Sequence, residues 1–393
     1  MGNGAGAVGA AAAARATDPS AEVTTVSSVT ALDTGKRTVD AEGRGTLNWD
    51  RLVLTEGTPG GAPAGVPTDL AGLYTVGSLP AVAEWDQALA DVKVAVVVDA
   101  TPAGVEVVAA LAQRGIETHL IDAHASALSG AVDAEIAGPV EESWAEMGVK
   151  AHFNTRVEEY LAGEAHKVGG VRTSEGELPA DLVVVCTRTP VANTLAAGAG
   201  LEISPTGGIV VDERMATSTA GVWAAGDCID LPAGVARFPL QDSASHAHAQ
   251  GRVAGTNAAG GRRTYQPAYV PWAMTAGRWL LGGVAYSEAQ AGALGIDYVL
   301  GKATGISRAR YYPDVKKVTV KLLAEPGSLR LIGAQLVGGE GIKERADFLG
   351  MAVRMGVTLT DLAFMENVYS PPIGALNEPI AVAAQNGLAS VRS

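Results

Sequence analysis

The first residues of the chain form a glycine loop that runs directly into a helix-forming segment. Gly2-Asn3-Gly4-Ala5-Gly6-Ala7 matches the pattern G-x-G-x-x-G/A, and the alanine-rich segment Ala10–Ala16 has a high helix propensity. Glycines in such a loop let the backbone approach a pyrophosphate, while the helix N-terminus supplies N–H groups and the positive end of its dipole. We therefore interpret Gly2, Gly4 and Ala7 as cofactor-binding positions.

The surroundings of this loop agree with a βαβ unit in one respect and depart from it in two. A strand is predicted at Glu22–Val26, at the spacing that the unit requires. However, no strand precedes the first glycine, and the acidic residue that normally follows the second strand is replaced by Ser27 and Ser28. Since a real deletion of a core strand should ruin the fold, we expect the natural polypeptide to contain residues before Met1 and between Ser28 and Val29.

A second βαβ unit is predicted in the middle of the chain. Val92–Val98 is a nearly continuous β-branched run, which is typical of a parallel strand covered on both faces. Thr101 can cap the following helix, Pro102 suits its first turn, and the next strand, Ile116–Ile121, ends in Asp122. This segment therefore predicts the same fold as the first unit.

The phosphate loop of the second unit is altered. Its first two glycine positions hold Asp99 and Thr101, while Gly104 is retained. A carboxylate at this place disfavours a dianionic ligand. Asp122 stands where a ribose-binding acid belongs. We predict a nicotinamide dinucleotide site with Gly104 and Asp122 as contacts and with a degraded phosphate loop.

The stretch Val222–Asp227 is a predicted strand that ends in small residues and a carboxylate. An Ala-Ala-Gly-Asp ending lets the backbone lie against a flat or charged ligand, and the carboxylate accepts hydrogen bonds from ligand hydroxyls. By itself the stretch would be an ordinary turn. Its setting after two βαβ units favours Gly226 and Asp227 as cofactor-binding residues.

Composition limits the partners and the kinds of site. The chain has 29 Lys plus Arg against 42 Asp plus Glu, a net charge of −13, which argues against nucleic acid or anionic membrane as partners. No apolar run approaches membrane-spanning length. Cys186 and Cys228 are far apart and have no metal-ligand spacing, while His246 and His248 lie on different helix faces. We expect no metal site and a cytoplasmic location.

From Tyr265 onward the pattern changes. Two strands, Lys316–Leu323 and Leu329–Val337, flank a Glu-Pro-Gly-Ser turn and predict a hairpin. Helical stretches are predicted at Gly341–Met355 and Asn377–Leu388. The order of elements predicts an α/β chain with two Rossmann-like dinucleotide-binding domains and a C-terminal α+β domain.

Short segments distributed over the whole chain together match one family. They are Gly2–Gly4, Asp18–Val23, Trp49–Gly57, Thr217–Ser218, Ala224–Cys228, Arg308–Pro313 and Tyr369–Pro372. With these segments the chain resembles the pyridine nucleotide-disulfide oxidoreductases, in the branch of coenzyme A disulfide reductases and NADH oxidases.

The resemblance implies cofactors, domains and a partner. FAD would be held by the first glycine loop and by Asp227, whose carboxylate would meet the ribitol hydroxyls. The FAD-binding domain would comprise 1–90 and 206–264, the NAD(P)-binding-like domain 91–205, and the dimerisation domain of a homodimer 265–393. Hydride would pass from NAD(P)H to the flavin and then to a cysteine-based or other acceptor.

Several departures from the family pattern leave the catalytic residues unknown. The reactive cysteine of the family belongs where Ser28 passes directly to Val29, and neither cysteine of the chain occupies that position. Thr55 and Glu56 replace an Ala-Thr pair, Arg188 replaces a glycine, and no histidine stands near the C-terminal tyrosine.

Three hypotheses follow from the sequence. The chain is an FAD-dependent NAD(P)H oxidoreductase with an unidentified acceptor. The alternative is a catalytically degenerate subunit of a larger complex, with a structural or electron-transfer role. The third is a regulatory nucleotide-binding protein.

Overall fold

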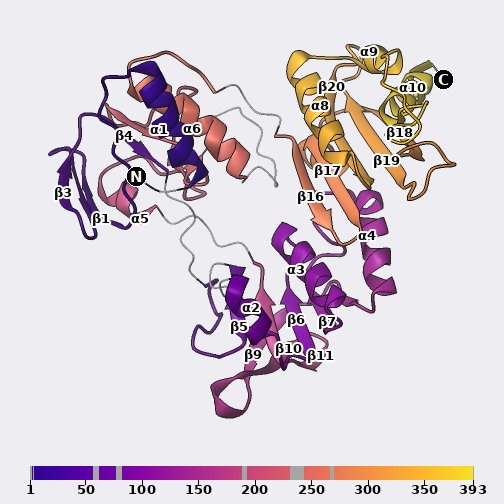
Figure 1. Ribbon diagram of the computed structural model, residues 1–393, viewed down its shortest axis with the longest axis horizontal. Helices are drawn as coiled ribbons and strands as arrows, with labels where there is room; N and C mark the ends of the chain where they lie inside the picture. The colour runs from indigo at the N-terminus through magenta and orange to yellow at the C-terminus, as the bar shows by residue number, and fades with distance from the viewer. Residues whose placement is uncertain are drawn as a thin grey trace. The chain divides into compact units, whose positions relative to one another are not determined.

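The computed structural model describes residues 2, 4–55, 62–76, 82–187, 193–230, 243–265 and 270–392. The chain divides into two compact units (Figure 1). Unit 1 comprises Met1–Gly60 and Thr189–Ala268, and unit 2 comprises Gly61–Arg188 and Tyr269–Ser393. Both units are discontinuous in sequence, and the division into three domains stays a prediction.

Unit 1 contains the first glycine loop and the Val222–Asp227 stretch. Strands β1, β2 and β3 form an antiparallel sheet, while β4 pairs in parallel with β14 and β13 pairs in parallel with β15. The elements are α1 (Ala5–Thr17), β1 (Val29–Asp33), β2 (Thr38–Ala41), β3 (Gly45–Asn48), β4 (Leu52–Leu54), α5 (Thr194–Gly198), β13 (Ile209–Val210), β14 (Val222–Ala224), β15 (Ile229–Asp230) and α6 (Ala244–Ala258).

Helices α1 and α6 lie side by side in unit 1 and touch backbone to backbone (Figure 1). A Cβ atom on Gly251 would lie 2.1 Å from the carbonyl oxygen of Gly6, and one on Gly255 would lie 2.1 Å from that of Ala10. On the other side of the contact, a Cβ on Gly9 would lie 2.4 Å from the carbonyl oxygen of His248. Glycine is therefore required on both helices for this approach.

The prediction of a strand at Glu22–Val26 is wrong. This segment follows α1 but forms no β-strand. Its backbone is tied at one end, where the Gly2 N–H donates a hydrogen bond to the Val26 carbonyl oxygen at 2.7 Å. A ladder needs a neighbour along its whole length, and a single bond at one end does not make one. The helix that carries His246 and His248 is α6, and residues 231–242 lie outside the described ranges.

Unit 2 contains a parallel five-stranded sheet in the order β5-β12-β6-β7-β8 and an antiparallel one in the order β16-β17-β20-β19-β18. Its first part consists of β5 (Leu73–Thr75), α2 (Val82–Ala88), β6 (Val94–Val98), α3 (Pro102–Gln113), β7 (Glu117–Ile121), α4 (Ala134–Glu146), β8 (Lys150–His152), β9 (Val157–Ala162), the 3₁₀ helix η2 (Glu164–His166), β10 (Val168–Thr173), β11 (Gly176–Pro179) and β12 (Leu182–Val185). Its second part consists of β16 (Trp272–Ala276), β17 (Trp279–Ala285), α7 (Glu288–Leu294), β18 (Val299–Ile306), β19 (Lys317–Ala324), β20 (Leu331–Gly338), α8 (Ile342–Met355), α9 (Leu359–Ala363) and α10 (Pro379–Arg392).

Most of the predicted elements of unit 2 are confirmed. The β-branched run is β6, whose Val96 and Val97 are completely buried in the middle of the parallel sheet. The predicted hairpin is the antiparallel pair β19 and β20. Helices α8 and α10 fall where the sequence places them, with α10 starting two residues later and ending four residues later. The fold is α/β, as predicted.

A buried cluster of charges joins β19 to the starts of helices α4 and α7 in unit 2. The Nζ atom of Lys321 on β19 lies 2.8 Å from Asp133 Oδ2, just before α4, and also pairs with Glu135 and Glu288. Lys321 is 1% exposed. Asp133 also accepts hydrogen bonds from the backbone N–H groups of Glu288 and Ala289 at the start of α7.

The close contact of α1 and α6 predicts the effect of an added methyl group. We expect Gly255→Ala to lower the free energy of unfolding by about 1–3 kcal/mol, because its Cβ would overlap the Ala10 carbonyl group. The matched control is Gly138→Ala inside α4, where the new Cβ meets no described atom within 4 Å. This variant should have a free energy of unfolding higher by about 0.5–1 kcal/mol, because alanine has the higher helix propensity. Equal changes in urea-unfolding midpoint for the two variants would contradict the packing argument.

Candidate functional site

The first glycine loop leaves open space in front of the N-terminus of α1. Gly4 is the N-cap residue, and its backbone is extended at φ −78° and ψ −174°. Among the described residues, no atom lies within 4 Å of the position that a Gly4 Cβ would take. The first N–H groups of the helix have no partner within the helix. The loop can therefore admit a phosphate group against those N–H groups.

Gly2 brings the loop against the end of β4. Its φ is +105°, a value that favours glycine, and a Cβ there would lie 2.5 Å from the Thr55 carbonyl oxygen. A Cβ on Gly6 is 3.3 Å from the Thr55 side chain. Ala7, in contrast, is 7% exposed and faces a cavity beneath α1. Its predicted contact with a cofactor stays a prediction.

The second part of the site is the turn that follows β14. Ala225 donates its N–H to the Leu54 carbonyl oxygen at 2.9 Å, which extends the pairing with β4. Gly226 has φ +89°, and its N–H donates to Gln250 Oε1 on α6 at 2.8 Å. Asp227 is partly exposed, and its carboxylate makes no hydrogen bond or ion pair that is recorded with the described residues. This carboxylate is available to accept hydrogen bonds from a ligand.

The structure brings these two parts to one edge of unit 1. Strands β4 and β14 run in parallel, so Thr55 and Gly226 follow the same ends of neighbouring strands. Ala247 on α6 is a common neighbour: its carbonyl oxygen is 3.5 Å from a Gly6 Cβ, and its own Cβ is 3.4 Å from a Gly226 Cβ. Ligands of doubly wound sheets bind at such carboxyl ends of strands.

The second phosphate loop, in unit 2, is closed by its own side chains. Asp99 adopts φ +70° where the motif has glycine, and its carboxylate accepts a hydrogen bond from the Thr187 hydroxyl group. Thr101 caps α3 by accepting the Gly104 N–H at 3.3 Å and donates to the Cys186 carbonyl oxygen at 3.0 Å. A Cβ on Gly104 would lie 2.0 Å from the Asp99 carbonyl oxygen, so this glycine is needed for the contact between helix and strand.

Both carboxylate oxygen atoms of Asp122 already accept hydrogen bonds from neighbouring residues of the chain. Its Oδ2 accepts the Ala100 N–H at 2.7 Å, and its Oδ1 accepts the His124 N–H at 2.7 Å and lies 2.8 Å from His124 Nδ1. Asp122 is 5% exposed. A ribose would have to compete with these partners, and ribose binding by Asp122 stays a prediction.

Asp99 adds an unfavourable charge to this loop. Burial raises the pKa of its carboxyl group, the Thr187 hydrogen bond lowers it, and the charge of Asp122 raises it again, so that the net shift is upward. A pyrophosphate at this loop would approach the carboxylate of Asp99.

Neither cysteine of the chain is placed for thiol chemistry. Cys186 is 2% exposed, Cys228 is completely buried, and both are free thiols. Burial, and after it the charge of Asp99, raises the pKa of the Cys186 thiol to about 12. Among the described residues, no group of three or more His, Cys, Asp and Glu side chains is placed to hold a metal ion, and no helix is long and apolar enough to cross a membrane.

Some features of the site could not be found from the sequence. Gln250 on α6 accepts a hydrogen bond from the N–H of Gly226, which lies 24 positions earlier in the chain. Ala247, also on α6, lies between the two parts of the site and contacts both. Gly251 and Gly255 lie four residues apart on α6, which is a spacing that could have indicated a close helix contact. Glu56 and Arg188, which depart from the family pattern, lie outside the described ranges.

Two family models match the chain. The model described as pyridine nucleotide-disulphide oxidoreductase matches residues 3–251, and the model of the dimerisation domain of the same proteins matches residues 274–379.

Individual relatives cover nearly the whole chain. An NADH oxidase of Methanocaldococcus jannaschii is 30% identical over 370 residues, which are 93% of this chain and 82% of that protein. An NAD(P)H sulfur oxidoreductase (CoA-dependent) of Pyrococcus abyssi is 29% identical over 364 residues, 90% of this chain and 79% of that protein. The solved structure of an NAD-dependent persulfide reductase from A. fulgidus superposes with a TM-score of 0.88 at 28% identity, covering 100% of this chain and 83% of that one.

Because the carboxylate of Asp227 is available to a ligand, we expect its removal to weaken the binding of FAD. We expect Asp227→Ala to weaken FAD binding by about 10- to 100-fold, since a hydrogen bond to a charged group contributes about 1.5–3 kcal/mol. Fluorescence titration of the flavin-free protein with FAD measures the change. Glu202→Ala, an exposed carboxylate of the same unit, is the control and should bind as the parent does. Equal affinities for all three proteins would show that Asp227 does not contact the cofactor.

Proposed function

Because the chain belongs to the pyridine nucleotide-disulphide oxidoreductase family, we propose that it is a flavoprotein that passes electrons from NAD(P)H through FAD to an acceptor. The observation that carries this proposal is the meeting of the open Gly4 loop, the N-terminus of α1 and the turn of Gly226 and Asp227 at one edge of unit 1.

The residues of this edge fit FAD. The backbone of Gly2 and Gly4 and the first N–H groups of α1 would hold the pyrophosphate, and Asp227 would accept hydrogen bonds from ribitol hydroxyls. Gln250 fixes the turn that carries Asp227 through its bond to the Gly226 N–H. The bound flavin supplies the capacity to accept a hydride and to release electrons.

Unit 2 supplies the proposed nicotinamide site. The N-terminus of α3 and Gly104 would face the dinucleotide, and Asp122 would stand near its ribose. Asp99 opposes the phosphates, so we infer a lower affinity for NAD(P)H than a loop with three glycines would give. Since both cysteines are buried, the acceptor would take its electrons from the flavin itself.

A second candidate function is supported by the closed second loop. The carboxylates of Asp99 and Asp122 are both engaged by neighbouring residues of the chain. This arrangement also suits a catalytically degenerate flavoprotein subunit, which keeps the fold for an electron-transfer or nucleotide-binding role in a larger complex.

We propose a homodimer that is built on the C-terminal part of the chain. The dimerisation model matches there. Three large apolar side chains are exposed on one face of α8: Phe348 at 46%, Met351 at 57% and Met355 at 70%. Exposed apolar side chains at this spacing suit a protein–protein contact. The cytoplasmic location stays the prediction made from the sequence.

An absorption spectrum tests the proposal directly. The gently purified protein, or the protein reconstituted with FAD, should show flavin bands that NADH or NADPH bleaches under anaerobic conditions. Absence of flavin after both treatments would refute the proposal. Bound flavin that neither nucleotide bleaches would favour the degenerate subunit.

Asp99 gives a prediction for the nicotinamide site. We expect Asp99→Gly to tighten NADH binding by about tenfold, or about 1.4 kcal/mol, because it removes a charge near the phosphates and suits the left-handed φ. In the parent, affinity should rise as the pH falls, because Asp99 has an upward-shifted pKa and becomes neutral; the variant should lack this dependence. Anaerobic titration of the flavin with NADH measures both effects.

The control is Glu142→Gln, an exposed carboxylate of the same unit, which should leave the titration unchanged. If Asp99→Gly and the parent bind NADH equally at every pH, the phosphates do not lie at this loop.

A further inference from the structure

Gln250 is a buried amide that holds the turn before Asp227. It lies on α6, is 7% exposed, and accepts the Gly226 N–H at its Oε1 over 2.8 Å. A carboxamide carries an acceptor oxygen on one side and an NH2 donor on the other. If the amide turned over, its NH2 group would face the N–H of Gly226 and this bond would be lost. The turn therefore depends on which way the amide points.

The side chain of Tyr265 fixes the direction of this amide. Its hydroxyl group is hydrogen-bonded to the side chain of Gln250. Burial raises the pKa of the Tyr265 hydroxyl group and the hydrogen bond to Gln250 lowers it, with a net upward shift. A hydrogen bond lowers the pKa of a phenol when it is donated to the phenol oxygen, because it favours the charged form. The Nε2 of Gln250 is thus the donor to Tyr265, which leaves Oε1 for Gly226.

Tyr265 is itself held in place by the segment that follows α6. Asn257, about two turns further along α6 than Gln250, is 7% exposed. Its Oδ1 accepts the Arg263 N–H at 2.8 Å, and its Nδ2 donates to the Arg263 carbonyl oxygen at 2.8 Å. The Tyr265 N–H donates to the Glu213 carbonyl oxygen at 2.7 Å, and the tyrosine ring packs against the core of unit 1. These contacts bring the Tyr265 hydroxyl group back to the middle of α6.

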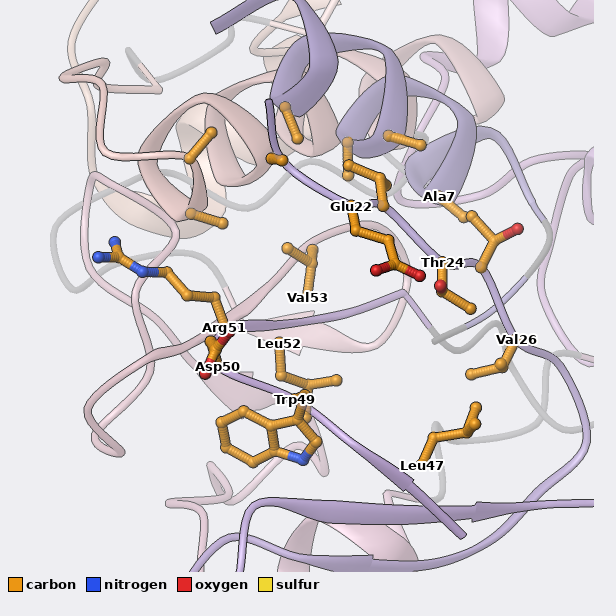
Figure 2. Close-up of a pocket in the computed structure, with 18 of the residues that line it drawn as sticks. Ala7, Glu22, Thr24, Val26, Leu47, Trp49, Asp50, Arg51, Leu52 and Val53 are labelled. Carbon is orange, nitrogen blue, oxygen red and sulfur yellow. The ribbon is translucent and has the colours of Figure 1, made fainter. Parts of the chain in front are cut away.

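The strand side of the turn is held by β4, whose residues Leu52 and Val53 are labelled in Figure 2. The Ala225 N–H donates to the Leu54 carbonyl oxygen at 2.9 Å and extends the pairing of β14 with β4. Gly226 follows with φ +89°, where the chain turns away from the strand. The strand therefore holds the residue before the turn, and α6 holds the turn itself through the Gly226 N–H.

We propose that Tyr265 is a positioning residue for the cofactor edge. Its hydroxyl group keeps the amide of Gln250 pointing toward the Gly226 N–H. The bond to Gly226 then sets the direction of the next residue, Asp227, whose carboxylate is the proposed contact with FAD. The consequence for FAD rests on the proposed function, whereas the hold on the turn is a property of the chain itself.

Amide exchange in the flavin-free protein tests the hold on the turn. Tyr265→Phe keeps the ring in the core and removes the hydroxyl group, so the buried Nε2 of Gln250 loses its partner. We expect the Gly226 N–H to exchange about tenfold faster, because leaving a buried donor unpaired loosens the local structure. Exchange of Ala225 should stay unchanged, since its N–H is bonded to Leu54 on β4. A role in general packing would speed both amides alike.

Titration with FAD tests the consequence at the cofactor. Tyr265→Phe should weaken binding by about three- to tenfold, the usual effect of one lost hydrogen bond. Gln250→Leu should weaken it at least as much, and the double variant should bind no more weakly than Gln250→Leu alone, because Tyr265 acts through Gln250. The matched control is Tyr298→Phe, which removes a hydroxyl group that donates to Glu288 Oε1 at 2.8 Å in unit 2. It should change neither FAD binding nor the exchange of Gly226.

The proposal fails if the Gly226 N–H exchanges at the same rate in Tyr265→Phe and in the parent, or if the Ala225 N–H is affected equally. It also fails if FAD binding is unchanged in Tyr265→Phe, or if the effects of Tyr265→Phe and Gln250→Leu simply add. Absence of FAD binding in the parent would refute the proposed function, since the exchange rates decide separately whether Tyr265 holds the turn.

Discussion

The direct backbone contact between α1 and α6 positions both parts of the cofactor edge. Gly251 and Gly255 let α6 lie against the Gly6 and Ala10 carbonyl groups, and this contact sets where the N-terminus of α1 points. The same helix α6 carries Gln250, which holds the turn before Asp227. A cofactor that touches both the loop and the carboxylate therefore depends on one helix pair.

The two glycine loops show how the same sequence pattern can lead to different sites. The first loop keeps its glycines and presents open space at Gly4, with no competing side chain recorded nearby among the described residues. The second keeps Gly104 for packing of α3, while Asp99 and Asp122 take hydrogen bonds from their own surroundings. The fold thus retains two dinucleotide-type loops. The first can bind an anion, whereas the second carries the carboxylate of Asp99, which repels one.

The sequence predicted those helices and strands that depend mainly on local periodicity and turn residues. The β-branched run of β6, the β19–β20 hairpin and helix α8 follow from periodicity and turn residues. The segment Glu22–Val26 has a strand-like sequence, but a strand also needs a neighbour, and sequence periodicity does not supply one. The partners of Asp122 come from Ala100 and from His124, and only the folded loop shows that they take up both of its oxygen atoms.

The buried charge cluster around Lys321 has a consequence for how this chain can be recombined with its relatives. Lys321 belongs to the C-terminal sheet, whereas Asp133 and Glu135 belong to the segment that carries the second loop. A buried charge that loses its partner is strongly destabilising. A chimera that exchanges the C-terminal sheet alone would separate these partners, so the natural boundary for exchange includes Asp133 and Glu135 together with Lys321.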